Sequence, residues 1–314
     1  MSKLPKKHKF LDLSDYGRPL AKLIANSLKN TSFTPIHVTI AFIISGVIAI
    51  YCILLGYNWL AAFFLILKSI LDASDGELAR VKQKPSYTGR YLDSVADIIL
   101  NAFIFMAVWY VTDAPIWLCI LAFFGLQLQG TLYNYYYVIL RNKFDGDTTS
   151  RVFENKTPSA LKGEKQAHVN TLFTLYKLFY GVFDKTIYAI DGKANKGNVL
   201  PNWLMTCTST FGLGFQLLII AVMLVLGLKA FILPFFLVYT SMVFVFIGIR
   251  KVFYQNFRQP VFSKQLKVYL IFTLIFCLHQ NYNRFVLCFH MRRNMKIANA
   301  TFLSTKMWLK KLRY

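Results

Sequence analysis

The chain has 314 residues, of which 56% are hydrophobic and only 16% are charged, and its apolar residues come in long runs. The formal net charge is +22, yet a chain this compatible with lipid is not an ordinary soluble nucleic-acid binder. The composition indicates a polytopic membrane protein whose basic groups attract anionic lipid head groups. The five cysteines form no C-x-x-C pair, so neither a disulfide framework nor a zinc site is predicted.

Residues 1–37 form a basic and polar lead, which we expect to be a cytoplasmic part of the mature protein. No secretory signal is evident, because the first apolar run begins only at Val38. Within the lead, residues 15–31 predict an amphipathic helix with one apolar stripe, formed by Leu20, Leu23, Ile24 and Leu28. We expect this helix to lie in the membrane interface, and packing on another protein surface is the alternative.

Six apolar segments follow, at residues 38–56, 58–72, 92–112, 115–137, 204–227 and 230–248. The links between them alternate between very short ones with almost no charge and longer ones that hold nearly all the Lys and Arg. Because basic loops stay on the cytoplasmic side, this alternation predicts six transmembrane helices with both termini cytoplasmic. The expected fold is an all-α integral membrane protein, with an amphipathic interfacial helix before the first span.

The longest link, residues 141–203, belongs to the six-span domain that we assign to residues 38–249. It mixes basic with acidic residues, and its stretch 172–190 is aromatic and partly amphipathic, so we expect an ordered cytoplasmic segment that roofs or lines a cavity. Residues 250–314 form a basic tail without acidic residues. The apolar run 269–278 in this tail is too short to span a bilayer, which favours an interfacial helix. We assign the tail no function.

Four aspartates gather around the link between the second and third apolar segments, at Asp72, Asp75, Asp93 and Asp97. Asp72 lies 13 residues after Trp59, and Asp97 lies 13 residues before Tyr110. If these aromatic residues mark the outer interface, both aspartates lie at one depth, about 20 Å from it. Each helix then presents two carboxylates on one face, and the cluster needs protons or cations to neutralise it. A divalent metal is the simplest answer.

The spacing of these residues resembles a known family signature. The stretch reads D-x2-D-G-x2-A-R-x8-G-x3-D-x3-D, and it matches every fixed position of the motif of the CDP-alcohol phosphatidyltransferases, with every spacer the right length. The matching residues are Asp72, Asp75, Gly76, Ala79, Arg80, Gly89, Asp93 and Asp97. The resemblance covers roughly the first 250 residues in topology, because the family core also has six spans.

The resemblance implies a role for each motif residue. Asp72, Asp75 and Asp93, with help from Asp97, would bind two divalent ions, for which oxygen ligands favour Mg²⁺ or Mn²⁺. Asp97 would also be the catalytic base that takes the proton of the acceptor hydroxyl. The remaining motif residues would line the site of the CDP group, namely Gly76, Ala79, Arg80 and Gly89.

The implied activity is the transfer of a substituted phosphate from a CDP-alcohol to an acceptor hydroxyl, with release of CMP, in phospholipid biosynthesis. CDP-diacylglycerol is the expected donor, because its tails can stay in the bilayer while the nucleotide enters from the cytoplasm. A CDP-choline or CDP-ethanolamine enzyme acting on diacylglycerol is the alternative within the class. A divalent-cation transporter that uses the same carboxylates is the alternative from another class.

The sequence leaves the acceptor open among glycerol 3-phosphate, serine, inositol or its phosphate, and another lipid. The expected partners are the donor, the acceptor and membrane lipid, without nucleic acid. The resemblance also implies a homodimer. Within the chain itself, the isolated small residues Gly125, Gly130, Gly212 and Gly214 are only weak signals for such an interface.

Overall fold

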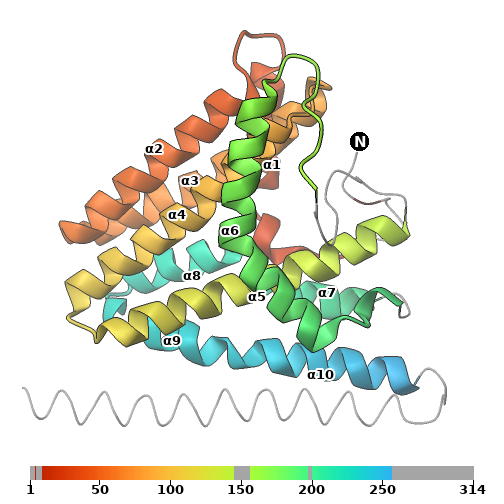
Figure 1. The fold of residues 1–314 in the computed structure, drawn as a ribbon. Coiled ribbons are helices and arrows are strands. Elements are labelled where there is room, and N and C mark those ends of the chain that lie inside the picture. The colour runs from red at the N-terminus through yellow and green to blue at the C-terminus, as the bar shows by residue number, and fades with distance from the viewer. Residues whose placement is uncertain (1–3, 5–8, 145–155, 197–199, 257–314) are drawn as a thin grey trace, which may run out of the picture. The chain divides into compact units, whose positions relative to one another are not determined.

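The computed structural model describes residues 4, 9–144, 156–196 and 200–256 (Figure 1). The chain forms two compact units, Met1–Val252 and Phe253–Tyr314, and the second lies almost entirely outside the described residues. The interfacial helix predicted over residues 269–278 falls in that part. Throughout the described residues every regular element is a helix, which confirms the all-α prediction.

The chain begins with a short lead helix, η2 (Leu13–Asp15), and α1 (Arg18–Leu28), before its long helices. Four long helices follow, α2 (Pro35–Leu54), α3 (Asn58–Val81), α4 (Tyr87–Thr112) and α5 (Ile116–Lys143). After α6 (Gln166–Asp191) and η3 (Ala194–Lys196) come α7 (Asn202–Thr208), η4 (Ser209–Phe211) and α8 (Leu213–Val225). The last elements are η5 (Lys229–Phe231), α9 (Ile232–Tyr239) and α10 (Ser241–Asn256).

Local sequence explains where the long helices begin and turn. Pro35 occupies the first turn of α2, where its missing N–H costs nothing, and the backbone N–H of Thr34 donates to His37 Nδ1 at 3.0 Å. Ser86 caps α4 by accepting a hydrogen bond from the Gly89 N–H at 2.8 Å. Gly56, with φ of +79°, turns the chain between α2 and α3.

Several helices are long and apolar enough to cross a membrane. They are α2, α4, α5 and the stretch Lys229–Val252, and a fifth span forms if Asn202–Phe211 and Leu213–Val225 cross as one element bent by 54°. α3 is also long enough to cross a membrane, but Lys68, Asp72 and Asp75 make it too charged to be recognised as a membrane span from its composition. The finding supports a polytopic membrane protein, while six spans and cytoplasmic termini remain predictions.

The main hydrophobic core joins α2, α3, α4, α5, α8 and α9. Its fully buried members include Leu65, Ile104, Leu224 and Phe236. Many large apolar side chains point outward instead, as expected where lipid replaces water. Trp59 and Tyr110, used above as markers of the outer interface, are 75% and 68% exposed, which fits that position.

The amphipathic helix of the lead is present as α1, somewhat shorter than the predicted range 15–31. It packs on α3 through the buried Ala21 and Ala25, while Leu20 and Leu23 are 52% and 65% exposed. One face of α1, with its alanines, therefore packs on the protein, while two leucines of the predicted apolar stripe are exposed. Exposed leucines on a helix with basic neighbours fit the predicted interfacial position.

Two glycines let the lead approach the broken fifth span closely. A Cβ at Gly214 would lie 2.1 Å from the carbonyl oxygen of Ser14, and one at Gly212 would lie 2.3 Å from the Ser14 Cβ. The Leu13 N–H also donates to Ser209 Oγ at 2.9 Å. These glycines, together with Gly125 against Thr240, serve contacts inside the chain, so their presence needs no dimer to explain it.

We predict that Gly214→Ala destabilises the protein by about 1–3 kcal/mol, because the added methyl group collides with backbone that cannot move aside as a side chain can. The thermal unfolding of the purified protein in detergent measures the effect. Gly248→Ala is the matched control, since a Cβ there meets nothing within 4 Å and alanine favours a helix. Equal melting temperatures for the two variants would contradict the close approach.

Candidate active site

The motif residues lie where two helices face each other across a short turn. α3 carries Asp72, Asp75, Gly76, Ala79 and Arg80 in its last three turns. The chain then reverses through residues 82–86, where Gln83 adopts a φ of 53°, and α4 carries Gly89, Asp93 and Asp97. α2 packs against both helices, whereas α3 and α4 make few backbone contacts with each other. The acidic side chains therefore lie between α3 and α4, and the packing of α2 on both helices fixes their relative position.

Three of the four aspartates form one cluster. Carboxylate oxygens of Asp72, Asp75 and Asp93 all lie within 4.8 Å of one another. Thr39 Oγ1 donates to Asp75 Oδ2 at 2.6 Å, which orients that carboxylate from α2. Asp93 Oδ1 is buried and accepts no hydrogen bond from the described residues. A close oxygen-donor set with an unsatisfied buried oxygen fits a hard divalent cation such as Mg²⁺ or Mn²⁺.

Asp97 lies outside this cluster and has a partner of its own. Lys68 Nζ donates to Asp97 Oδ1 at 2.6 Å, and the Lys68 side chain is fully buried. The sequence analysis missed Lys68, although the residue was visible as a lone cation in an apolar run, four residues before Asp72. An ionisable residue at such a position is a sign of function by default.

The four residues expected near the CDP group gather at the same end of α3 and α4. A Cβ at Gly76 would lie 3.6 Å from Arg80 Nη2, so the guanidinium covers this glycine. Gly89 leaves room for the helix cap, because a Cβ there would come within 3.1 Å of Ser86 Oγ. Ala79 is half-buried on the same stretch of α3. Three of the four thus lie on the last turns of α3 and Gly89 lies in the first turn of α4, and what they bind stays a prediction.

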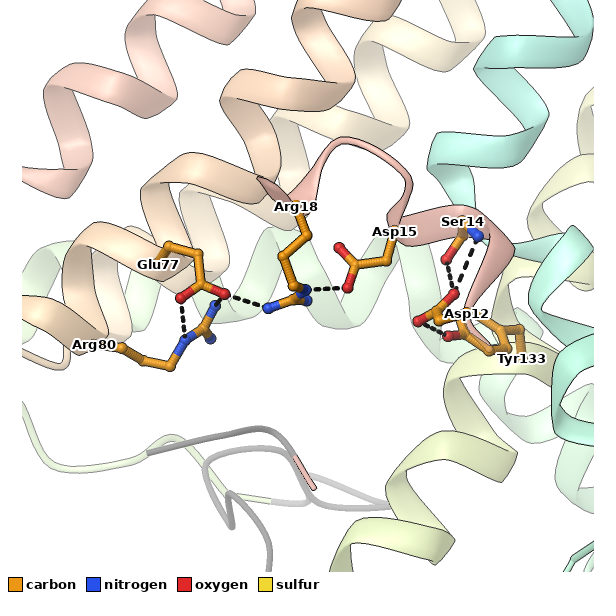
Figure 2. Close-up of polar contacts among 7 residues, drawn as sticks. All are labelled: Asp12, Ser14, Asp15, Arg18, Glu77, Arg80 and Tyr133. Atoms are coloured by element: carbon orange, nitrogen blue, oxygen red, sulfur yellow. Dashed lines mark hydrogen bonds and ion pairs between the residues drawn. The ribbon is translucent and has the colours of Figure 1, made fainter. Parts of the chain in front are cut away.

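Arg80 belongs to a polar network that ties the lead to the motif helix (Figure 2). Glu77 accepts from Arg80, with Nη2 and Oε1 3.0 Å apart, and it also pairs with Arg18, which in turn pairs with Asp15. Although burial opposes ionisation, Arg80, Arg18 and Lys22 hold the pKa of the Glu77 carboxyl below its ordinary value. The motif leaves position 77 unspecified, and the partner that joins Glu77 to the lead, Arg18, is 59 residues away.

A second set of polar contacts joins the lead to α5, and both sets border a cavity. Tyr133 donates to Asp12 Oδ2 at 2.5 Å, and Ser14 Oγ donates to Asp12 Oδ1 at 2.6 Å (Figure 2). The cavity has a volume of about 310 Å³ and is lined by Leu4, Lys9, Phe10, Asp12, Asp15, Arg18, Lys22, Glu77, Arg80 and Tyr137. It mixes both charge signs, so it does not by itself select an anion or a cation.

The described part of residues 141–203 packs against the motif helix α4. Tyr180 of α6 donates to the Ser94 carbonyl oxygen at 3.0 Å, and Tyr91 of α4 meets Phe173 with ring centroids 5.5 Å apart. Burial raises the pKa of the Tyr180 phenol, and the nearby carboxylates of Asp97 and Asp93 raise it further. The segment is thus ordered beside the acidic residues, as expected from its aromatic pattern.

Glu164 fixes the start of α4 from this segment. Its Oε1 accepts from Ser86 Oγ at 2.7 Å and from the Thr88 N–H at 2.8 Å, while Oε2 accepts from the Leu161 N–H at 3.0 Å. A carboxylate at a helix N-terminus also meets the positive end of the helix dipole. Glu164 therefore helps to position the turn from which Gly89 and Asp93 extend.

Comparison with known proteins identifies this stretch of the chain. Residues 33–162 match the model of the CDP-alcohol phosphatidyltransferase family. The match confirms the family resemblance, and the matched residues include α2 to α5 and all eight motif residues.

One curated relative is the bifunctional IPC transferase and DIPP synthase of Thermococcus kodakarensis. It is 30% identical to this chain over 149 residues, which cover 46% of this chain and 33% of the relative. The chain thus spans about a third of the length of this curated relative.

The partners of Glu164 predict a pH dependence of stability. Although partial burial opposes ionisation, hydrogen bonds from Ser86, Thr88 and Leu161 lower its pKa. A lowered pKa in the folded state adds stability that is complete above the unfolded value, about 4.3, and is lost as the pH falls through the folded value. We therefore predict that Glu164→Gln flattens the acid limb of the melting temperature measured against pH.

Lys162→Gln is the control for this experiment, because it alters a neighbouring exposed charge and leaves the cap intact. It should leave the acid limb unchanged. An identical acid limb for wild type and Glu164→Gln would contradict the assigned role of Glu164.

Proposed function

We propose that the protein is an integral membrane CDP-alcohol phosphotransferase that moves a substituted phosphate to an acceptor hydroxyl and releases CMP. The observation that carries the proposal is the Asp72, Asp75 and Asp93 cluster, at the motif positions of a segment that matches the family. Acidic residues in a membrane protein need cations, and a CDP-alcohol brings phosphates that need the same cations.

The three clustered aspartates would hold divalent metal, Mg²⁺ or Mn²⁺, with two ions as the family resemblance implies. When bound, the metal neutralises the donor pyrophosphate and the charge that develops on the CMP leaving group. Thr39 keeps the Asp75 carboxylate turned toward the cluster through its hydrogen bond. The expectation that Asp97 also helps to bind metal remains a prediction.

The other motif residues would bind the donor and take the proton. Arg80 offers a forked, permanently charged donor to phosphate oxygens, and the small Gly76 and Ala79 let the nucleotide approach the α3 backbone. Asp97 takes the proton of the acceptor hydroxyl, while the oxygen of that hydroxyl forms a bond to the phosphorus that carries the donor alcohol. The bond from that phosphorus to the CMP oxygen breaks, and CMP leaves with the electron pair.

CDP-diacylglycerol is the donor that we favour, because a diacylglycerol group can remain in lipid beside apolar helices. The exposed apolar side chains around α2 and α4 support such a position. A CDP-choline or CDP-ethanolamine enzyme differs only in which substrate carries the lipid, so direct comparison of donors separates the two. The site is expected to face the cytoplasm, and the acceptor alcohol is the least constrained part of the proposal.

The proposal predicts CMP release from CDP-diacylglycerol by the purified protein in lipid, in the presence of Mg²⁺ or Mn²⁺ and a suitable acceptor. Asp93→Asn should lower kcat by about 100-fold or more, because it weakens the metal site and therefore the stabilisation of the leaving group. A chelator should abolish CMP release in the wild type. Chromatographic detection of CMP, with acceptor alcohols added one at a time, measures both effects.

Asp113→Asn is the matched control, since Asp113 is exposed in the turn after α4, far along the helix from the cluster. It should retain wild-type turnover. Metal uptake into proteoliposomes without CMP formation from any donor and acceptor would favour the transporter and contradict the proposal.

A second variant tests the catalytic base. Asp97→Asn should lower kcat by about 10²–10⁴-fold, because an amide cannot accept the hydroxyl proton, while the affinity for the CDP donor stays close to that of the wild type. Equilibrium binding of labelled donor and single-turnover CMP release measure the two quantities separately. Loss of donor binding together with turnover would place Asp97 in the donor site instead.

A further inference from the structure

Arg80, the arginine of the motif, is held by a carboxylate that the motif does not specify. Glu77 lies three residues before it on α3, with Oε1 3.0 Å from Arg80 Nη2, and Oε2 accepts from Arg80 Nε at 3.5 Å. The Glu77 side chain is only 11% exposed, and a carboxylate in such a place needs cationic partners. These two contacts anchor one edge of the guanidinium group.

The anchored guanidinium group lies over Gly76. A Cβ at Gly76 would lie 3.6 Å from Arg80 Nη2 and 3.7 Å from Arg80 Nη1. Nη1 donates no hydrogen bond to the part of the chain that the structure describes, so this nitrogen can still donate to a ligand. Because Asp72, Gly76 and Arg80 follow one another at intervals of four residues, they share one face of α3. Gly76 therefore lies, without a side chain, between a carboxylate of the acidic cluster and the guanidinium group.

The lead holds Glu77 from the other side. Arg18, at the start of α1, pairs with the same Oε1 of Glu77 and also with Asp15 (Figure 2). α1 packs on α3, and Arg18 lies outside residues 33–162, the part of the chain that matches the family model. A carboxylate with a charged partner on each side is fixed in one rotamer. The orientation of Arg80 thus depends on the lead as well as on α3.

We propose that Glu77 and Arg18 are positioning residues that direct Arg80 toward the pyrophosphate of the CDP donor. Glu77 fixes one edge of the guanidinium group and leaves Nη1 to donate to a phosphate oxygen, and Arg18 keeps Glu77 in the rotamer that this contact needs. An arginine that is oriented in advance loses less rotamer entropy when it binds a phosphate, so the donor binds more tightly. The inference rests on the proposed function, which gives the donor as the ligand of Arg80.

The test is a set of variants of the full-length protein, assayed in lipid with Mg²⁺ and CDP-diacylglycerol. Glu77→Gln removes the charge of the anchor and nearly keeps its shape. The KM of the donor should rise about tenfold while kcat stays within about twofold of wild type, because the ground state and the transition state lose the same contact. Arg18→Gln loosens Glu77 without removing it and should raise the donor KM about threefold. The dissociation constant of CDP, measured by equilibrium binding with Mg²⁺, should rise in parallel.

The effect of Glu77 has to pass through Arg80, and a double-mutant cycle measures this. Arg80→Met should itself raise the donor KM, and adding Glu77→Gln to it should change the KM by less than about twofold. Tyr133→Phe is the matched control, because it removes the hydrogen bond from α5 to Asp12 of the lead and leaves the contacts of Glu77 intact. It should keep the wild-type donor KM, which separates the positioning of Arg80 from a general loosening of the lead.

Two results would overturn the proposal. An unchanged donor KM in folded Glu77→Gln would show that Arg80 needs no anchor, and equal rises in the wild-type and Arg80→Met backgrounds would show that Glu77 acts by another route. Melting temperatures in detergent show which variants fold. If Glu77→Gln does not fold, Arg18→Gln decides by the same two criteria, because it leaves the contact between Glu77 and Arg80 in place. A wild-type protein that binds no CDP and releases no CMP would instead contradict the proposed function, and this inference with it.

Discussion

Repulsion among four carboxylates is the constraint on which the rest of this structure depends. α3 and α4 bring Asp72, Asp75, Asp93 and Asp97 near one another, where one carboxylate is buried and the other three are partly exposed. Such a group is stable only with cations, and the chain supplies one of them itself through Lys68. We infer that the remaining three carboxylates need a divalent ion, so that the repulsion that destabilises the fold also favours binding of the metal.

The surrounding elements hold this arrangement from several sides. α2 contacts both acid-bearing helices and orients Asp75 through Thr39. The lead reaches the motif helix through Arg18 and Glu77, and the segment after α5 fixes the start of α4 through Glu164. Catalytic groups on helices that are supported by such a second layer keep their geometry better than groups on loops. The positions of Asp72 to Asp97 are therefore set by contacts that come from far along the chain.

Sequence reasoning succeeded where the signal was local. The apolar runs predicted the long helices, and the spacing of the aspartates predicted one cluster of four carboxylates, of which the structure brings three within 4.8 Å of one another. It did not find the pairs Lys68–Asp97, Arg18–Glu77 and Ser86–Glu164, because each of them joins residues 29 or more positions apart, which no periodicity encodes. Gly212 and Gly214 were read as weak dimer signals for the same reason, since their contact with Ser14 is visible only in three dimensions. The six-span topology, the cytoplasmic orientation and the dimer remain predictions.

The central claim is that the clustered aspartates of the motif bind a divalent metal ion. An experimental structure of the protein with Mn²⁺ bound, with the metal located by its anomalous scattering, tests this claim most directly. The account predicts Mn²⁺ within about 2.2 Å of oxygens from Asp72, Asp75 and Asp93. Mn²⁺ bound elsewhere, with none of these three carboxylates coordinating it, would contradict the account.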